Sequence, residues 1–489
     1  MKCGNSVFGH AHLPTFNFGC RASQADGAAL KRQLLESGLQ EARDIAASQV
    51  VVLNTCTVTA RADAEVRQWV RRIHRANPHC RILVTGCYAQ RSPEEIAPLD
   101  GVAWVVGNSH KHVIADLLRS QDSEVRIQDS GFRIQEPEAA RQAGLVRIHP
   151  QKANRALPHE AFSHRDAPPA QPGTPRQSMV LVGEIAEEFH FAPVFPDDRT
   201  RPTLKVQDGC NARCSFCVIP SVRGRSRSLA PEKVVEQVRE LQRSGYKEIV
   251  LSGINLGSYG RDIDRRITFL SLLEMLLAET AIQRLRISSI EPMDVSPALI
   301  RLVAEEPRLA QHFHIPLQSG SSRILRLMNR RYWPAQYAER ILAIRERIPN
   351  AGIGADVMVG FPGETDQDHA ASAAFIDSLP FTYLHIFPYS ARPHTPAAAL
   401  REQVNGRVAR NRAQEIRALL APKRQAFLQA QIGRKLSALT LDESETGERV
   451  ALSSNYLKIV LPGLNLSPNT LLDVQVGRIH EGLLFGFPA

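Results

Sequence analysis

Three cysteines lie close together in the segment "DGCNARCSFCVIP", at Cys210, Cys214 and Cys217; we call them the compact set. A structural zinc ion bound by side chains takes four ligands, and no second short Cys or His pair follows this segment. A [4Fe–4S] cluster takes one ligand per iron, so three cysteines leave one iron open to a small molecule. The spacing therefore favours an iron–sulfur cluster with an open coordination position over a structural zinc ion.

A second group of cysteines, the dispersed set, is spread along the N-terminal part of the chain. Cys20 follows the apolar run "TFNFG", Cys56 follows "VVVLNT" and Cys87 follows "RILVTG". These runs predict buried strands of a parallel sheet, and in open α/β sheets the carboxyl ends of the strands meet at one crevice. One such cysteine alone is more often a small buried apolar residue, but the shared placement predicts a second three-cysteine site. Cys3 and Cys80 match neither set, and we expect both to be dispensable.

Alternating strands and helices are expected around both sets. Residues 14–120 alternate strand-like apolar runs with helical segments such as "ADAEVRQWVRRIHRA", which predicts a small open α/β domain. Residues 201–425 contain six further strand candidates separated by helical segments, at 203–207, 248–253, 284–289, 312–317, 354–360 and 383–389. Six βα units predict an open partial barrel related to the TIM barrel. The compact set directly follows the first strand, at the carboxyl edge where barrel active sites lie.

Two other regions have a different composition. Residues 121–200 include "HEAFSHRDAPPAQPGTPRQS", which is rich in Pro, His, Ser and Ala and predicts a flexible linker. Residues 426–489 begin at the end of a basic helix expected over 411–432 and continue as short alternating segments such as "KLSALTL" and "YLKIVL". This pattern predicts a small C-terminal all-β domain.

The C-x3-C-x2-C spacing after the first barrel strand resembles that of radical S-adenosylmethionine (SAM) enzymes. Together with the dispersed set and the two flanking domains, it resembles the radical SAM methylthiotransferase family, whose terminal domain is a TRAM-like RNA-binding barrel. The motifs "NTCTVT", "TGCYAQ" and "QDGCNARCSFCVIP" most resemble the branch that acts on N6-threonylcarbamoyladenosine in tRNA. Two features depart from the family pattern. Ala22 and Ser23 stand where an Asn usually follows the first cysteine, and the 121–200 linker is longer than expected.

The resemblance implies an activity and a set of cofactors. Such an enzyme methylthiolates C2 of N6-threonylcarbamoyladenosine at position 37, next to the anticodon, and uses two [4Fe–4S] clusters. The compact set would hold the cluster whose open iron binds the amino and carboxylate groups of SAM and cleaves it to a 5′-deoxyadenosyl radical. The dispersed set would hold the cluster that carries the sulfur, which is methylated with a second SAM. The implied partners are tRNA, an electron donor such as flavodoxin or ferredoxin, and a source of sulfur.

Residues at the ends of the other barrel strands are candidates for binding SAM. "SGINLGSYG" ends the second strand, and its glycines would let a ligand approach the backbone closely; the alternative is an ordinary Gly-rich loop. "SSIEP", "PLQSG" and "GADVMVGFPGE" end later strands, and the alternative for their polar side chains is a structural role. The expected cofactor-binding residues are Gly253, Asn255, Ser288, Glu291, Gln318 and Asp356.

The charge of the chain favours a polyanionic partner such as RNA. The 489 residues include 60 Lys plus Arg against 50 Asp plus Glu, a net charge of +10, although many soluble proteins are mildly basic. Arg223, Arg225 and Arg227 alternate in "RGRSRS", which would place them on one side for phosphate contacts; the alternative is a solvated basic loop. No run approaches the roughly 20 apolar residues of a membrane span. Because the N-terminus also lacks a long apolar signal segment, we expect a cytoplasmic protein with no membrane partner.

Other activities are compatible with the same residues. A sibling of this family could methylthiolate isopentenyladenosine in tRNA or an aspartate of a ribosomal protein. A more distant alternative is a non-catalytic iron–sulfur regulator that binds RNA, which would need one cluster at most and no cofactor-binding barrel. Iron analysis of anaerobically purified protein separates these classes, because two [4Fe–4S] clusters require about eight iron atoms, whereas zinc would contradict the enzyme.

Overall fold

The computed structural model describes residues 15–41, 44–46, 48–119, 132–134, 146–150, 178–185, 200–445, 447–464 and 466–489. These residues divide into two compact units. The first unit lies within Met1–Ser23, Leu30–His190 and Ser221–Arg223. The second lies within Gln24–Ala29, Phe191–Pro220 and Gly224–Ala489.

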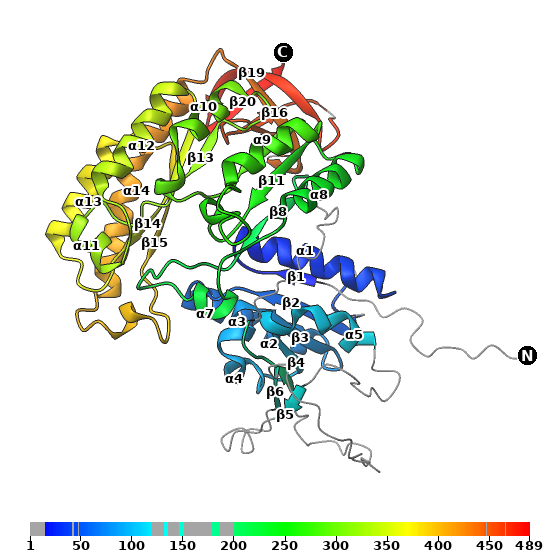
Figure 1. The fold of residues 1–489 in the computed structure, drawn as a ribbon. Helices are drawn as coiled ribbons and strands as arrows, with labels where there is room; N and C mark the ends of the chain where they lie inside the picture. The colour runs from blue at the N-terminus through cyan, green and yellow to red at the C-terminus, as the bar shows by residue number, and fades with distance from the viewer. Residues whose placement is uncertain are drawn as a thin grey trace, which may run out of the picture. The chain divides into compact units, whose positions relative to one another are not determined.

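The first unit is built on a seven-stranded sheet (Figure 1). Its strands are, in spatial order, β1 (Thr15–Asn17), β2 (Val50–Thr55), β3 (Arg81–Gly86), β4 (Val102–Gly107), β7 (Met179–Leu181), β6 (Val146–Pro150) and β5 (Phe132–Ile134). The helical elements are α1 (Arg21–Glu36), α2 (Ala60–Ala76), α3 (Cys87–Arg91), α4 (Pro93–Ile96), η1 (Asn108–Val113) and α5 (Ile114–Arg119). Strands β1 to β4 are parallel neighbours, as the strand–helix alternation predicts.

The sheet is apolar on both faces. Val51, Val52 and Leu53 are consecutive in β2 and all fully buried, although alternate residues of a strand face opposite sides. Two separate apolar clusters cover the faces, one containing Val51 and Leu53 and the other containing Val52. Burial on both sides explains why the sequence shows continuous apolar runs here rather than alternation.

The expectation of a linker over the whole of 121–200 is wrong in part. Three strands, β5, β6 and β7, come from this segment and join the sheet. Strand β7 pairs in parallel with β4 through Trp104 and Met179. Residues 178, 182–185 and 200 of the predicted linker are described as well, and its remaining residues lie outside the described part of the chain. These strands are only three to five residues long, so they give little periodicity to a sequence-based reading.

The second unit contains the six predicted barrel strands in two three-stranded parallel sheets. One sheet has the order β12 (Arg284–Ile287), β11 (Glu248–Ser252) and β8 (Thr203–Lys205), and the other has the order β13 (His312–His314), β14 (Gly352–Val359) and β15 (Tyr383–Pro388). A parallel bridge between Leu285 and Leu309 continues the curve from β12 toward β13. The helices cover the outside of these strands (Figure 1). They are α8 (Pro231–Arg243), α9 (Phe269–Glu279), α10 (Pro297–Glu305), α11 (Ser322–Leu327), α12 (Pro334–Arg347), α13 (Asp366–Ser378) and α14 (Gly406–Gln429).

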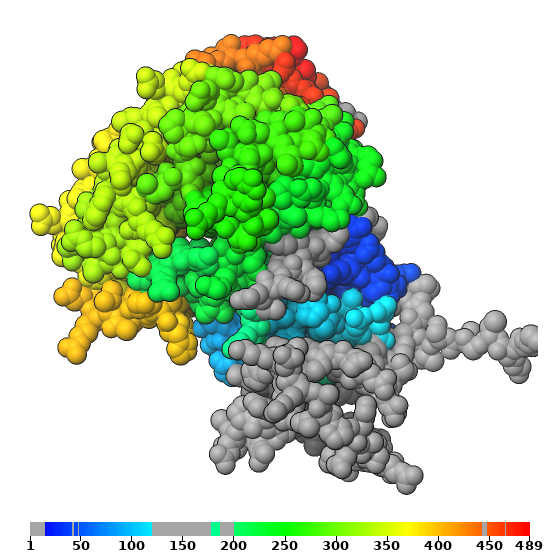
Figure 2. Space-filling model, viewed as in Figure 1, coloured from blue at the N-terminus to red at the C-terminus, as the bar shows by residue number. Residues whose placement is uncertain are grey.

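The C-terminal residues form a closed five-stranded barrel. Its strands are β16 (Lys435–Glu445), β17 (Glu448–Ser453), β18 (Lys458–Leu461), β20 (Leu483–Pro488) and β19 (Leu471–His480). The sequence analysis did not identify β17, whose "ERVALS" begins with two charged residues after a turn at Gly447. In the space-filling view these residues, orange to red, form a continuous surface with the green and yellow βα units (Figure 2).

A buried ion cluster joins this small barrel to the amino ends of the larger barrel's strands. Glu248, the first residue of β11, is fully buried and accepts hydrogen bonds from Arg286 Nε at 2.7 Å and Arg284 Nη1 at 3.2 Å. Arg286 also donates to the carbonyl oxygens of Ser453 and Ser454, each at 3.0 Å. Burial would raise the pKa of Glu248, but the charges of Arg286, Arg201 and Arg284 outweigh it and lower the pKa to about 2. With the amino end closed, the carboxyl end of the strands is left for a functional site.

Candidate metal centres and the barrel mouth

The compact set lies in a loop that follows β8 and the short strand β9 (Gln207–Asp208). The loop is held by backbone hydrogen bonds, from Cys210 N to Gly224 O at 3.1 Å and from Cys217 N to Cys214 O at 3.1 Å. Gly209 before it has φ +68°, and a Cβ there would lie 1.9 Å from Arg225 O. The sequence therefore needs glycine at this position to turn the chain into the loop.

The thiols of the compact set are close enough to influence one another. Burial, with a further contribution from the charges of Cys214 and Cys210, raises the pKa of Cys217 to about 12. Burial likewise raises the pKa of Cys210. The three cysteines are half-buried, and bound as thiolates they need a compensating positive charge, which a metal cluster supplies. The donor set therefore fits an iron–sulfur cluster with three protein ligands.

The dispersed set is brought together by the parallel sheet. Cys20 follows β1 and precedes α1, Cys56 follows β2, and Cys87 is the first residue of α3 directly after β3. A Cβ at Gly19, where φ is +102°, would lie 2.2 Å from the Cys56 Cβ, so the first two strand ends touch. The pKa of Cys56 is raised by its hydrogen bond to Cys20, by burial, and by the charges of Cys20 and Cys87.

The dispersed set has polar neighbours around its sulfurs. The pKa of Cys20 lies well below its ordinary value, because the hydrogen bond with Cys56 and the Arg223 charge outweigh the effect of burial. Ser23 Oγ lies 3.6 Å from Cys20 Sγ, so a hydroxyl stands where the family pattern has an Asn. Asn108 Nδ2 donates to Cys87 Sγ at 3.5 Å. Three thiols at one sheet edge, with donors around them, also fit a metal cluster.

The two other cysteines belong to neither centre. Cys80 is buried in the apolar core of the first unit, where its Sγ lies 3.7 Å from Arg81 O. Cys3 lies outside the described residues. Neither the burial nor the neighbours of Cys80 indicate a ligand.

The expected cofactor-binding residues lie around the carboxyl ends of the barrel strands. Asn255 N donates to Gln207 Oε1 at 2.8 Å, and a Cβ at Gly253 would lie 2.9 Å from the same oxygen. Gln207 is fully buried and links this loop to the compact set through its amide, which donates to Gly209 O at 2.8 Å. Gln207 stands inside the motif "QDGCNARCSFCVIP", but nothing in the sequence pattern indicated this role. Ser288 is buried at the end of the third strand, where its N donates to Leu251 O at 3.0 Å.

Two of these side chains carry buried oxygens that have no hydrogen-bond partner among the described residues, Asn255 Oδ1 and Gln318 Oε1. Gln318 also has φ +63°, a left-handed conformation that is strained for a residue with a side chain. Buried polar atoms are nearly always paired in a complete site. These atoms therefore fit a site that is completed by a polar cofactor such as SAM.

Arg330 links the compact set to Glu291, and the sequence analysis did not identify it. Its Nη1 donates to Cys214 Sγ at 3.4 Å, and its Nη2 forms an ion pair with Glu291. Burial raises the pKa of Glu291, and the nearby Arg330 opposes this effect. Arg330 is distant in sequence from both partners, and "NRRYW" resembles an ordinary basic turn. No sequence signal distinguished it.

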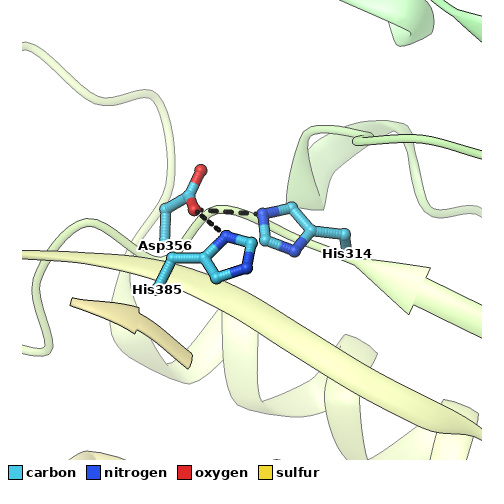
Figure 3. Close-up of side chains that lie close together, drawn as sticks. All are labelled: His314, Asp356 and His385. Atoms are coloured by element: carbon cyan, nitrogen blue, oxygen red, sulfur yellow. Dashed lines mark hydrogen bonds and ion pairs between the residues drawn. The ribbon is translucent and has the colours of Figure 1, made fainter. Parts of the chain in front are cut away.

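A second polar group lies in the barrel on β13, β14 and β15 (Figure 3). His314 Nε2 and His385 Nδ1 lie 3.1 and 3.2 Å from the same oxygen of Asp356, Oδ1. Burial would raise the pKa of Asp356, but the hydrogen bonds from both histidines hold it well below its ordinary value. The sequence analysis selected Asp356 as a cofactor-binding residue but overlooked His314 and His385, whose register beside it depends on strand pairing.

The three arginines after the compact set do not share one side, so this prediction is wrong. Arg223 ends the short helix α7 (Ile219–Arg223) and is buried, and Arg227 is buried in β10 (Arg227–Ser228). Arg225 is exposed. The turn at Gly224, with φ +75°, breaks the alternation that the sequence pattern assumed.

Comparison with known proteins assigns both units. The radical SAM superfamily matches residues 204–376, and the uncharacterized protein family UPF0004 matches residues 13–107. The threonylcarbamoyladenosine tRNA methylthiotransferase MtaB of Aquifex aeolicus is 35% identical over 91% of this chain and 95% of its own, and that of Bacillus subtilis is 34% identical over 94% and 92%. The tRNA-2-methylthio-N(6)-dimethylallyladenosine synthase of Pelotomaculum thermopropionicum is 31% identical over 82% and 80%.

Solved structures support the fold. The radical SAM methyltransferase TsrM from Kitasatospora setae has a TM-score of 0.52 at 17% identity, covering 80% of this chain and 74% of that one. At this identity the likeness concerns the fold alone. Among the helices of the described residues, none has the length and apolar character needed to cross a membrane.

Proposed function

Since the chain belongs to the tRNA methylthiotransferase family, we propose that it transfers a methylthio group to C2 of N6-threonylcarbamoyladenosine at position 37 of tRNA, next to the anticodon. The protein is a radical SAM enzyme whose cofactors are [4Fe–4S] clusters and SAM. The observation that carries the proposal is the convergence of the dispersed set at one sheet edge. A radical SAM enzyme that only cleaves SAM needs the compact set alone, whereas sulfur insertion needs a second centre.

Each cysteine set has a proposed role. The compact set would hold the cluster that, with bound SAM, supplies the 5′-deoxyadenosyl radical needed to activate the C2–H bond. The dispersed set would hold the cluster that provides the sulfur. An external one-electron donor, such as flavodoxin or ferredoxin, and a source of sulfur are further partners in this proposal.

The chain's own residues would orient SAM at the barrel mouth. Asn255 and Gln318 offer the unpaired buried oxygens described above, and Gly253 leaves the backbone of the second strand end accessible. Ser288 lies at the third strand end. Glu291 is held by Arg330, so its carboxylate is fixed beside the compact set.

Exposed basic residues are proposed to contact the tRNA backbone. Arg225 is exposed next to the compact set. Further exposed arginines lie along α14 and the start of the C-terminal barrel, namely Arg407, Arg410, Arg424 and Arg434. Contacts of this kind make affinity fall with salt. The C-terminal barrel itself is proposed to bind RNA in the manner of a TRAM domain.

Nucleoside mass spectrometry of tRNA from a strain lacking the gene tests the proposed substrate. We expect the 2-methylthio derivative of N6-threonylcarbamoyladenosine to disappear and its precursor to accumulate. Loss of the 2-methylthio derivative of dimethylallyladenosine instead would identify the sibling activity. An unchanged nucleoside profile would contradict both.

A further inference from the structure

The side chains of His314, Asp356 and His385 project from three neighbouring strands into one space (Figure 3). In the pairing register, His314 lies beside Gly354, and Asp356 lies beside His385. Residues 354 and 356 of β14 face the same side, because alternate residues of a strand share a face. Tyr383 occupies the space that a side chain at Gly354 would fill, since a Cβ there would lie 2.0 Å from its ring.

The hydrogen bonds of this group run in one direction. A carboxylate only accepts, so His314 Nε2 and His385 Nδ1 both carry the hydrogens that they share with Asp356. With His314 neutral, its Nδ1 accepts from the Tyr383 hydroxyl at 3.1 Å, and Tyr383 accepts from His312 Nε2 at 2.7 Å. The donor chain fixes the rings around Asp356 and directs the other ring nitrogen of His385 away from the carboxylate.

Exposure decreases along this chain. The side chain of His385 is 61% exposed, that of Asp356 28%, and that of His314 10%. The buried His314 thus holds Asp356 in place, and the more exposed Asp356 and His385 are able to contact a ligand. The exposed ring nitrogen of His385 and the partly exposed carboxylate of Asp356 offer one hydrogen-bonding group each.

The group lies close to the proposed SAM-binding residues. Asp356 O accepts from Gln318 N at 2.8 Å. Burial is the main cause of the raised pKa of Glu291, and the negative charge of Asp356 adds to it, so the two carboxylates are close enough to interact electrostatically. Glu291 is paired with Arg330, which contacts Cys214. A ligand at Asp356 and His385 would therefore lie beside the reacting centre.

The chemistry of this group matches one of the two candidate nucleosides. A threonylcarbamoyl group carries urea N–H groups, a hydroxyl and a carboxylate, whereas a dimethylallyl group is wholly apolar. A carboxylate such as Asp356 accepts from N–H or hydroxyl groups. The imidazolium form of His385, which gives its Nδ1 hydrogen to Asp356, can also donate from its other ring nitrogen to a carboxylate. A site built from such groups rejects an analogue that leaves them unpaired.

We propose that Asp356 and His385, oriented by His314, bind the threonylcarbamoyl group of the substrate nucleoside and determine its selection over the dimethylallyl group. The proposal rests on the proposed function and reassigns Asp356 from SAM to the substrate. Asp356 accepts from the urea or hydroxyl group, and His385 donates to the carboxylate of the threonyl part. His314 acts on the substrate only through Asp356 and is a positioning residue.

The test uses the holoenzyme and an anticodon stem-loop RNA that carries N6-threonylcarbamoyladenosine, either as the free acid or as its methyl ester. The ester keeps the size of the group but removes the charge that His385 is proposed to recognise. We expect the wild type to favour the acid in kcat/KM by about 10-fold or more. In His385→Ala this preference should fall to about 2-fold, and His385→Arg, which keeps a donor and a charge, should restore part of it. The ratio of kcat/KM for the acid to kcat/KM for the ester is measured within each variant. A general loss of activity lowers both values equally and leaves this ratio unchanged.

The controls separate the possible failures. His79→Ala, at an exposed turn of the first unit, should keep the wild-type ratio. If the wild type does not convert the acid RNA at all, the proposed function fails. If it converts acid and ester equally, or if His385→Ala keeps the preference, the assignment of these residues fails while the function stands. Loss of one metal equivalent in His385→Ala would show that the three residues bind a metal ion instead, and would also overturn the assignment.

Discussion

The two cysteine sets reach similar arrangements by different routes. The compact set lies within one loop whose shape is fixed by its own backbone hydrogen bonds, whereas the dispersed set is assembled from the ends of three parallel strands. The first can therefore be recognised from spacing alone. The second exists only when β1, β2 and β3 are paired in register, so its metal occupancy depends on the folding of the whole sheet.

The electrostatic surroundings of the two sets differ as well. Burial raises the pKa values of Cys210 and Cys217. In the dispersed set the pKa of Cys20 is lowered and that of Cys56 is raised, mainly by the hydrogen bond between the two thiols. The charged partner of the compact set is Arg330, which donates directly to a cysteine sulfur. Four predictions test how separate the two sets are.

The largest effect is expected from removing a ligand of the compact set. Cys217→Ala should abolish SAM cleavage and methylthiolation. It should also remove about half of the iron, because the cluster has only three protein ligands and would be left with two. Circular dichroism should remain that of the wild type. Measurable 5′-deoxyadenosine from this variant would contradict the assignment.

Removing a ligand of the dispersed set should abolish methylthiolation and leave SAM cleavage. We expect Cys56→Ala to keep about half of the iron and to produce 5′-deoxyadenosine without modifying tRNA. The two sets belong to different compact units, so one can assemble without the other. Loss of all iron would show that they are not independent.

A matched pair of glycine variants makes the same comparison without touching a ligand. Gly19→Ala places a Cβ against Cys56, and Gly209→Ala places one against Arg225 O. We expect each to lower the iron content of its own site by more than half, because the φ values of both residues also disfavour a side chain. Mössbauer spectra, which distinguish the two clusters, should show loss of the cluster of the dispersed set in Gly19→Ala and loss of the cluster of the compact set in Gly209→Ala. The same loss in both variants would contradict separate sites.

The smallest effects are expected from the donors to the cysteine sulfurs. Arg330→Gln removes a charge next to Cys214, so the reduced cluster loses stabilisation and its potential becomes more negative. SAM cleavage should fall by about 10-fold. Asn108→Ala removes a neutral donor to Cys87 and should shift the other cluster less. Redox titration followed by electron paramagnetic resonance measures the change in reduction potential of each cluster. Equal changes in the two variants would contradict a larger effect of the charged donor Arg330 than of the neutral donor Asn108.

Much of the fold could be predicted because its signals are local. Strands β2, β3 and β4 contain consecutive apolar residues, the six barrel strands recur between helical segments, and the family motifs surround the cysteines directly. The short strands β5, β6 and β7 gave no such signal, because strands of three to five residues have almost no periodicity. The prediction that Arg223, Arg225 and Arg227 share one side was wrong because the chain turns at Gly224. The positive φ of this glycine could not be inferred from the alternation of the arginines.

The missed site residues are those defined by tertiary contacts. Arg330 reaches Cys214 and Glu291 only after α11 has returned the chain to the barrel mouth. His314 and His385 meet Asp356 through the pairing of three strands that are far apart in sequence. Asp356 was selected because the segment "GADVMVGFPGE" was expected at a strand end, although Asp356 lies within β14. Its partners could not be identified without the strand register.

The buried ion cluster between the two barrels also bears on how this protein is made. Arg284 and Arg286 are buried against Glu248 and the carbonyls of Leu452, Ser453 and Ser454, which belong to β17 and the turn after it and are synthesised about 170 residues later than the arginines. The small barrel closes only with β20, at Leu483–Pro488. The amino end of the radical SAM barrel therefore stays open to water until the small barrel has been synthesised and closed, and a chain that lacks the small barrel leaves two arginines without their carbonyl partners. Truncation at residue 433 is thus a folding defect, and the role of the small barrel in RNA binding is better tested by surface substitutions.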